Sequence, residues 1–302
     1  MEVLAQRQGL GANSISNVNW SYSSNNWSYY GHYSSDLLTN LNNFTAPADA
    51  SNALFIIWCA DADFVWNILN YGADMTQWTN AMNQSLSNHF TAVTNLYHAK
   101  GARTVLMPNA VDLTKVPRFS SATDKDFIRQ RTIDFNATFA TTLKRRIETN
   151  CPNIAIYIPD IFALLDDIVA NFTNYGLIKP ETYVFKDLPP AQWALNGPGT
   201  NYVFWDNLDP TAKAHAVFAD VIQQFISPVR ISKITPFTGS NRLDVINVPI
   251  GLNGFVDAST NFVNWTSQAS FSSTNATQTI FIPASGPLEF YRLRFPFAWS
   301  WP

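Results

Sequence analysis

The sequence predicts an α/β fold with a parallel sheet, followed by a small all-β region. Two observations support this: three short apolar runs alternate with long helical patterns, and no helical period recurs after residue 227. Continuous apolar runs are typical of strands covered on both faces, as in parallel sheets. Their alternation with helices is typical of βαβ units. We therefore expect an α/β domain over residues 1–227 and a β-rich domain over residues 228–302.

The elements of the first domain follow from local patterns. A short helix is expected over residues 2–10 and a buried strand over 52–59. A long helical pattern over 75–100 ends at Gly101, because glycine readily adopts the left-handed conformation of a helix C-terminus. The same reasoning gives strands at 103–108, 154–158 and 203–205, and helices at 123–150, 161–171 and 210–225, the last with Pro210 in its first turn.

The second domain reads as short β-type runs separated by turn residues, which favours a small sandwich. The runs lie at residues 243–248, 254–256, 262–265, 279–282 and 289–294.

Composition excludes several function classes. With 46% hydrophobic residues in 302, the chain can bury a large core. A net charge of −3 gives no basic face for nucleic acid or anionic lipid. No apolar run reaches the roughly 18 residues of a membrane-spanning helix. The N-terminal residues 1–7 contain no apolar signal core, so an export signal is absent or was removed, and a secreted or periplasmic location stays open.

Cysteine and histidine usage predicts neither a disulfide framework nor a metal site. Cys59 and Cys151 are the two cysteines, and the four histidines form no cluster at ligand spacing. We expect no cofactor and no structural metal. Sequons such as Asn136-Ala137-Thr138 and Asn264-Trp265-Thr266 are common at this composition and are weak evidence for secretion.

The segment Phe-Trp-Asp-Asn-Leu-Asp-Pro-Thr at residues 204–211 is the most informative motif. It resembles the last sequence block of the GDSL/SGNH lipases and esterases, F-W-D-x-x-H-P-T. Residues 17–22 and 56–64 resemble the second and third blocks, so the resemblance covers about residues 2–227. It implies a three-layer, flavodoxin-like SGNH-hydrolase fold. It also implies a Ser-His-Asp triad that hydrolyses carboxylic or carbohydrate esters, with a small-molecule ester or saccharide as partner.

Each block departs from the family pattern. The resemblance places Ser23 or Ser24 at the glycine of the second block. In the third block, G-x-N-D, it places Ala60 at the glycine and Ala62 at the asparagine that donates to the oxyanion, and Asp63 is retained.

The catalytic residues depart further. Asp206 matches the family's triad acid, but Asp209 stands at the histidine position. No Gly-Asp-Ser occurs in the 302 residues, and residues 2–5 resemble the helix that follows the nucleophile strand. The block with the serine is therefore expected upstream of the first residues.

These departures predict impaired serine-esterase chemistry. A carboxylate is ordinarily about two pKa units or more below imidazole and is too weak a base at neutral pH. Losing one oxyanion donor typically costs about 10²–10³ in rate. The chain is therefore expected to be a hydrolase relative with a degenerate site.

Three other interpretations stay open for the acidic residues Asp61, Asp63, Asp206 and Asp209. If all four lie at the carboxyl ends of strands, paired carboxylates suit glycoside hydrolysis, or they bind Mg²⁺ or Ca²⁺. Alternatively Asp63 and Asp206 cap helices or turns, and Asp209 is the N-cap before Pro210. The cleft, with His32 near it, could also serve a saccharide- or partner-binding module without catalysis.

The expected loss of the nucleophile strand has a structural consequence. Its neighbours in the sheet would keep unpaired backbone groups. The sheet closes over the gap, or a strand from a second subunit or the apolar tail at residues 295–299 fills it. A homo-oligomer formed through the incomplete sheet is one expectation.

Overall fold

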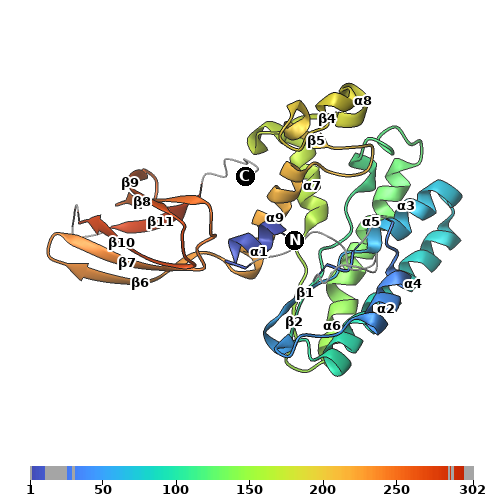
Figure 1. The fold of residues 1–302 in the computed structure, drawn as a ribbon, viewed down its shortest axis with the longest axis horizontal. Helices are drawn as coiled ribbons and strands as arrows, with labels where there is room; N and C mark the ends of the chain where they lie inside the picture. Colours follow the sequence, from blue (N-terminus) through green and yellow to red (C-terminus); the bar gives the residue numbers. More distant parts are fainter. Residues whose placement is uncertain (1, 11–25, 29–30, 285, 287–288, 296–302) are drawn as a thin grey trace. The chain divides into compact units, whose positions relative to one another are not determined.

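The computed structural model describes residues 2–10, 26–28, 31–284, 286 and 289–295, and it contains a parallel sheet with helices and a separate antiparallel β region (Figure 1). The chain divides into two compact units, Met1–Ser14 with His215–Pro302, and Ile15–Ala214. This division into compact units does not establish a boundary between independently folding domains, so the domain boundary at residue 227 stays a prediction. Among the described residues, no helix is long and apolar enough to cross a membrane.

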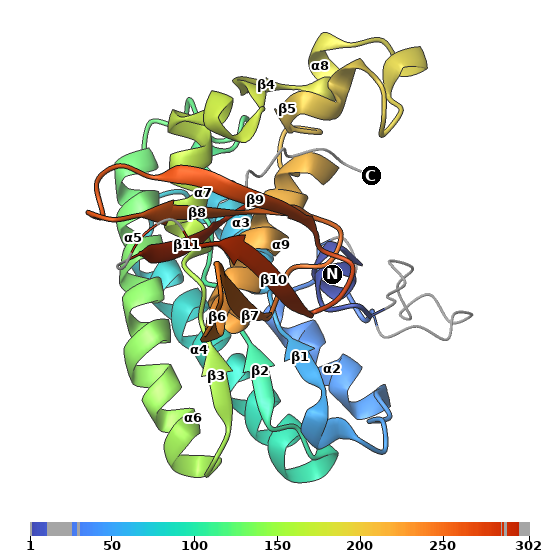
Figure 2. The same ribbon diagram turned by 90° about the vertical axis from the view of Figure 1, so that its left-hand side faces the viewer.

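The parallel sheet of the unit Ile15–Ala214 has the order β1-β2-β3 (Figure 2). Its strands are β1 (Leu54–Ile56), β2 (Thr104–Leu106) and β3 (Ala155–Tyr157). Each strand falls inside a predicted apolar run, and the central strand is the most buried because sheet neighbours flank it on both sides. A second parallel pair joins β4 (Ile178–Tyr183) to β5 (Tyr202–Phe204).

Helices connect these strands. The α-helices are α2 (Ser34–Asn43), α3 (Ala60–Tyr71), α4 (Met75–Lys100), α5 (Lys125–Thr138), α6 (Lys144–Asn150), α7 (Ile161–Ala170) and α8 (Val184–Asp187). Short helical turns are η2 (Ala50–Asn52), η3 (Leu113–Lys115), η5 (Phe172–Tyr175), η6 (Pro190–Gln192) and η7 (Pro198–Asn201).

Helix α4 begins and ends where its sequence directs. The Asp74 carboxylate accepts hydrogen bonds from the backbone N–H groups of Thr76 and Gln77, at 2.9 and 3.1 Å. Gly101 follows the last turn with φ of 79°, the left-handed conformation expected there. The predicted stop at Gly101 is confirmed.

The predicted helical stretch over residues 123–150 is confirmed from Lys125 to Asn150, with one π-helical turn inside it. Between α5 and α6 lies the π-helical turn η4 (Phe139–Leu143), which is wider than a turn of α-helix. The Phe139 ring then lies 5.4 Å from that of Phe135 and 5.1 Å from the imidazole of His89. The apolar pattern continues through this turn and gives no sign of its π-helical geometry.

The antiparallel region consists of two three-stranded sheets, ordered β10-β7-β6 and β11-β8-β9. Their inner faces share a core in which Leu243, Val256 and Ile282 are buried, as a small sandwich requires. The strands are β6 (Arg230–Phe237), β7 (Ser240–Ile246), β8 (Asn253–Ser259), β9 (Thr266–Ser272), β10 (Thr277–Pro283) and β11 (Phe290–Arg294).

One predicted run in this region is wrong. Residues 262–265 form a loop between β8 and β9 rather than a strand, because Phe262 adopts a φ of 60°. A positive φ is outside the β region of backbone space.

A buried ion pair fastens the first helix of the same compact unit. Arg7, at the end of α1 (Glu2–Arg7), donates from Nε to Oδ1 of Asp220 on α9 (Ala212–Ile226), at 2.6 Å. The Arg7 guanidinium also reaches the carbonyl of Ile250, whose N–H donates to the Arg7 carbonyl. Burial raises the pKa of Asp220 although Arg7 opposes the shift, so the pair carries a desolvation cost that its hydrogen bonds offset.

In the parallel sheet, the described residues pair β1 with β2 alone, so its other edge carries no described strand. The tail residues 296–302 lie outside the described residues. Filling of this edge by a second subunit or by the tail stays a prediction.

We expect Asp220→Ala to lower the free energy of unfolding by about 3 kcal/mol, because it leaves the buried Arg7 guanidinium without a partner. Asp244→Ala is the matched control, since Asp244 pairs with Arg242 at the surface and such pairs contribute about 1 kcal/mol or less. Calorimetric melting of the full chain measures both variants. Equal melting temperatures for the two would contradict the assigned role of Arg7.

Candidate functional site

Two of the predicted acidic residues lie in the first turn of α3, directly after β1. The backbone N–H of Val111, from the segment that follows β2, donates to Oδ1 of Asp61 at 2.9 Å. Burial raises the pKa of Asp61 to about 7, while hydrogen bonds from Val111 and the Trp58 side chain oppose the shift. Asp61 therefore holds its proton through mildly acidic pH and fastens two neighbouring strand ends.

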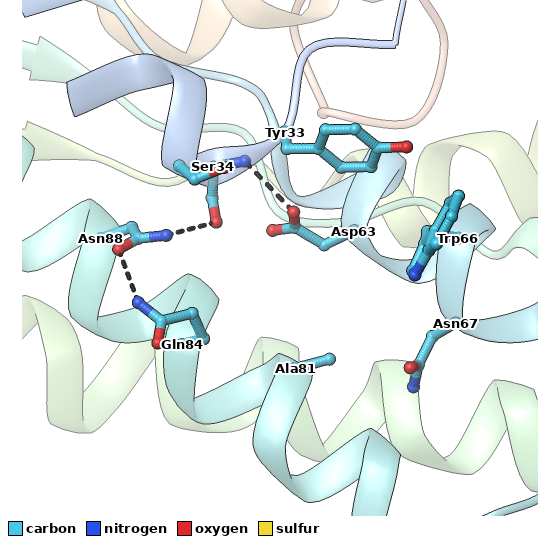
Figure 3. A pocket seen from close by; sticks show the side chains of 9 residues that line it. Tyr33, Ser34, Asp63, Trp66, Asn67, Ala81, Gln84 and Asn88 are labelled. Atoms are coloured by element: carbon cyan, nitrogen blue, oxygen red, sulfur yellow. Dashed lines mark hydrogen bonds between the residues drawn. The ribbon is translucent and has the colours of Figure 1, made fainter. Parts of the chain in front are cut away.

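Asp63 lies in the wall of a pocket of about 140 Å³ between α2, α3 and α4 (Figure 3). Its Oδ1 accepts a hydrogen bond of 3.2 Å from the N–H of Ser34, the first residue of α2. Burial raises the pKa of Asp63, and hydrogen bonding from Ser34 reduces the shift. Tyr33 and Trp66 stand edge to face at the same pocket, with ring centroids 6.3 Å apart.

A chain of polar contacts continues from this wall into α4 (Figure 3). Asn88 donates to the Ser34 hydroxyl, and Gln84 donates to the Asn88 carbonyl oxygen, each at 2.9 Å. The chain fixes the start of α2 against α4, so the position of Asp63 depends on the buried Asn88 amide as well as on its own helix.

The other predicted residues of the second and third blocks lie in different surroundings. Ala60 is buried and Ala62 partly buried in the first turn of α3, and their methyl groups offer no hydrogen-bond donor. His32 contacts the Asn40 side chain of α2 through Nε2 at 2.7 Å, and burial lowers its pKa despite the nearby Asp36. Ser23 and Ser24 lie outside the described residues.

Asp206 organises the turn that follows β5. Its Oδ1 accepts hydrogen bonds from the N–H groups of Leu208 and Asp209, both at 2.7 Å. The Trp205 N–H donates to the Asp209 carbonyl at 2.8 Å and closes the turn. A side chain with this many fixed partners is held in one orientation.

Asp209 has an unusual proton affinity for an aspartate. Partial burial, the charge of Asp206 and a side-chain hydrogen bond to Asp206 together raise the pKa of Asp209 to about 6. Unperturbed imidazole titrates near 6.5, so the expected gap of two units or more between this carboxylate and a histidine is wrong for this environment. The Asp209 carboxyl therefore gains or loses its proton near pH 6.

The capping interpretation of Asp209 is also wrong. Pro210 pairs with Phe204 in a β-bridge, which keeps the backbone extended past Asp209. Helix α9 begins at Ala212, and the Thr211 hydroxyl accepts the N–H of Ala214 at 3.2 Å, so Thr211 caps the helix.

The four acidic residues lie in two segments, the first turn of α3 and the turn after β5. Among the described residues, no hydrogen bond or ion pair joins Asp61 or Asp63 to Asp206 or Asp209, and no group of three or more metal-ligating side chains is present. The segment after β2 reaches both sites: its Val111 contacts the first, and further along it the Arg118 N–H donates to the carbonyl next to Asp206, at 2.9 Å.

Sequence reasoning missed the residues that hold this segment. Asp112 is fully buried, accepts from the N–H and hydroxyl of Thr114 at 3.0 and 2.6 Å, and pairs with Arg129. Arg129 also reaches Asp166 on α7 at 2.5 Å. The signal was available in part, because Asp-Leu-Thr at 112–114 is the local pattern of a helix N-cap.

Two buried asparagines also hold the segment that follows β2. Asn136 accepts the Ala110 N–H at 3.0 Å and donates to the Ala110 carbonyl at 2.8 Å. Asn109 donates to Asp160 at 2.8 Å and accepts the Phe162 N–H at 3.0 Å. Such long-range partners leave no local sequence pattern.

Cys59 and His89 form a buried pair without nucleophilic character. Sγ lies 3.5 Å from Nε2, and Nδ1 lies 2.8 Å from the Ser85 carbonyl, which assigns the ring proton to Nδ1. Burial lowers the pKa of His89 to about 4 and raises that of the Cys59 thiol. Both groups are neutral near pH 7, whereas a reactive cysteine needs a thiolate.

We expect Asp61→Asn to flatten the pH dependence of stability. Because folding raises the pKa of Asp61 from 3.8 to about 7, this carboxyl contributes stability below about pH 4 that is lost as pH rises to 7. Between about pH 4.5 and 8, the unfolding free energy of the wild type should fall by about 1–3 kcal/mol more than that of the variant. Urea unfolding measures this, with exposed Asp49→Asn as the control, and parallel curves for wild type and Asp61→Asn would contradict the shift.

Comparison with known proteins gives a distant similarity to plant hydrolases. No protein-family model matches the chain. It is 24% identical over 209 residues to a GDSL esterase/lipase of Arabidopsis thaliana, which covers 61% of this chain and 55% of the relative. It is 22% identical over 229 residues to another from the same plant, covering 70% of the chain and 63% of the relative. The chain thus spans less than two thirds of these relatives, and the similarity supports a relationship to the GDSL esterase/lipases and hence to a hydrolase family.

Proposed function

We propose that the unit Ile15–Ala214 carries an ester-hydrolase-type site, of SGNH-like fold, in which Asp209 replaces the imidazole base. The relationship to GDSL esterase/lipases supports the reaction class. The observation that carries the proposal is the Asp206–Asp209 pair, because the pKa of Asp209 near 6 makes it a base of almost histidine strength. The substrate class is a carboxylic or carbohydrate ester.

The two carboxyl groups have different roles in the proposed reaction. Asp206 is fixed by two backbone N–H groups and orients Asp209, as the third member of a triad orients its base. Asp209 takes a proton from the attacking oxygen as that oxygen bonds to the ester carbonyl carbon. It then returns the proton to the departing alcohol, so the carboxylate is regenerated.

The rest of the site limits the rate. The 302 residues contain no Gly-Asp-Ser, and Ala62 places a methyl group where the resembling family has an amide donor. Without that donor the developing oxyanion is less stabilised. We therefore propose that this chain is impaired as a serine esterase, with a water molecule as the nucleophile in the residual reaction.

Hydrolysis of p-nitrophenyl acetate by the purified chain tests the proposal. The expected rate is low but above buffer and rises with pH through about 6, since only the ionised form of Asp209 accepts a proton. Asp209→Asn should remove this rise, and Asp209→His should restore it with a midpoint near that of imidazole, about 6.5. Asp49→Asn, at an exposed position, is the matched control.

Two results would contradict the proposed chemistry. Inactivation by a serine-directed phosphonate would show that a serine nucleophile operates. A rate that Asp209→Asn leaves unchanged would exclude Asp209 as the base. A rate equal to buffer would instead favour the alternative of a non-catalytic saccharide- or partner-binding module.

Glycoside hydrolysis by the same pair is less well supported. Glycosidase carboxyls stand about 5 Å apart or more to leave room for the sugar carbon or a water. Asp206 and Asp209 are joined by a hydrogen bond and are closer than that. Turnover of an aryl glycoside that is lost in Asp206→Asn and Asp209→Asn would favour this alternative over ester hydrolysis.

A further inference from the structure

The loop between β8 and β9 presents two adjacent apolar side chains to solvent. Phe262 is 62% exposed and Val263 is 78% exposed. Large apolar side chains that stand together at a loop tip mark an interaction surface more often than isolated ones do.

The loop is braced in a strained conformation. Phe262 has a φ of 60°, which is costly for an aromatic residue. The Asn261 side-chain oxygen accepts the N–H groups of Val263 and Asn264, both at 2.9 Å, and the Trp265 indole donates to the Phe262 carbonyl at 3.0 Å. The surrounding hydrogen bonds therefore hold the backbone of the loop in this conformation.

Phe262, Trp265 and Phe290 form an aromatic corner. The rings of Phe262 and Phe290 lie 3.6 Å apart at 31°, and Trp265 stands 6.4 Å from Phe262 at 63°. Because Phe290 covers one face of Phe262 and the residue is still largely exposed, the other face is open. Arg292 lies 4.5 Å over the Trp265 ring, and its charge is paired with Asp257.

The surrounding chemistry selects the ligand. Residues 258–288 contain no Asp, Glu, Lys or Arg and are rich in Ser, Thr, Asn and Gln. Insertion into an anionic lipid surface is favoured by unpaired Lys and Arg beside the apolar tip; residues 258–288 contain none, and the nearby Arg292 is paired with Asp257. Neutral hydroxyl and amide groups instead match the donors and acceptors of sugar hydroxyls, while an open aromatic face matches the apolar C–H face of a sugar ring.

We propose that the aromatic corner binds a neutral polysaccharide. A sugar ring stacks on the open face of Phe262, and the exposed polar side chains of Asn264 and Thr266 bond its hydroxyls. One stacking site gives weak affinity, so a polymer with repeated rings is the fitting ligand. Binding here does not depend on ester hydrolysis by the other unit.

Retention of the full chain on cellulose, chitin, xylan and mannan tests the proposal. The wild type should be retained by at least one of these polymers, and Phe262→Ala should weaken retention about tenfold or more by removing the stacking face. Phe262→Tyr should keep it. Phe281→Ala is the matched control, because Phe281 is 60% exposed on β10 and lies outside the corner.

Three results would overturn the proposal. They are retention on none of the four polymers, equal losses for Phe262→Ala and Phe281→Ala at unchanged melting temperature, and binding to phosphatidylserine vesicles instead of polymer. In the last case Val263→Ser, which removes the apolar tip but not the stacking face, should abolish vesicle binding. Ester turnover is measured separately, so its failure leaves the retention result unaffected.

Discussion

The ion pair between Arg129 and the fully buried Asp112 is the interaction on which the carboxyl edge of the parallel sheet depends. Asp112 has no access to water, so its charge is tolerable because Arg129 and the two donors of Thr114 compensate it. The pair fixes the segment at residues 110–118, and that segment in turn bonds both acidic sites. Without it, the first turn of α3 and the turn after β5 would each have to hold their carboxyl groups without this support. The geometry of the candidate site is therefore a property of the core beneath it.

Much of the fold could be predicted because its signals are local. Continuous apolar runs located the strands of the parallel sheet, and Gly101 marked the end of α4. The π-helical turn at Phe139–Leu143 escaped prediction, since one extra residue per turn hardly alters an apolar pattern. Residues 262–265 have the composition of a strand, but hydrogen bonds from the backbone N–H groups of Val263 and Asn264 to the Asn261 side chain impose a loop.

The sequence identified candidate residues for the site but did not predict their proton affinities. The motif at residues 204–211 drew attention to Asp206 and Asp209, and the structure shows them in one turn. The sequence could not predict their proton affinity, because that affinity depends on burial and on the distance between the two carboxyl groups. The same limit applies to Asp61, whose partner Val111 lies on another strand end. The residue at a motif position thus identifies the chemical group that is present, whereas the surroundings that the fold provides set the proton affinity of that group.

The burial of Asn136 bears on how the chain can be processed. Its amide is the acceptor nitrogen of a sequon, and in the folded unit that nitrogen donates to the Ala110 carbonyl from inside the core. A glycan there would break both bonds to Ala110 and could not fit within the packed helices. Folding and glycosylation therefore compete for one atom at position 136, and a natively folded molecule is one in which folding came first. The exposed Asn264 is under no such conflict, and a glycan attached there would stand beside Phe262 and compete with any ligand for the aromatic corner.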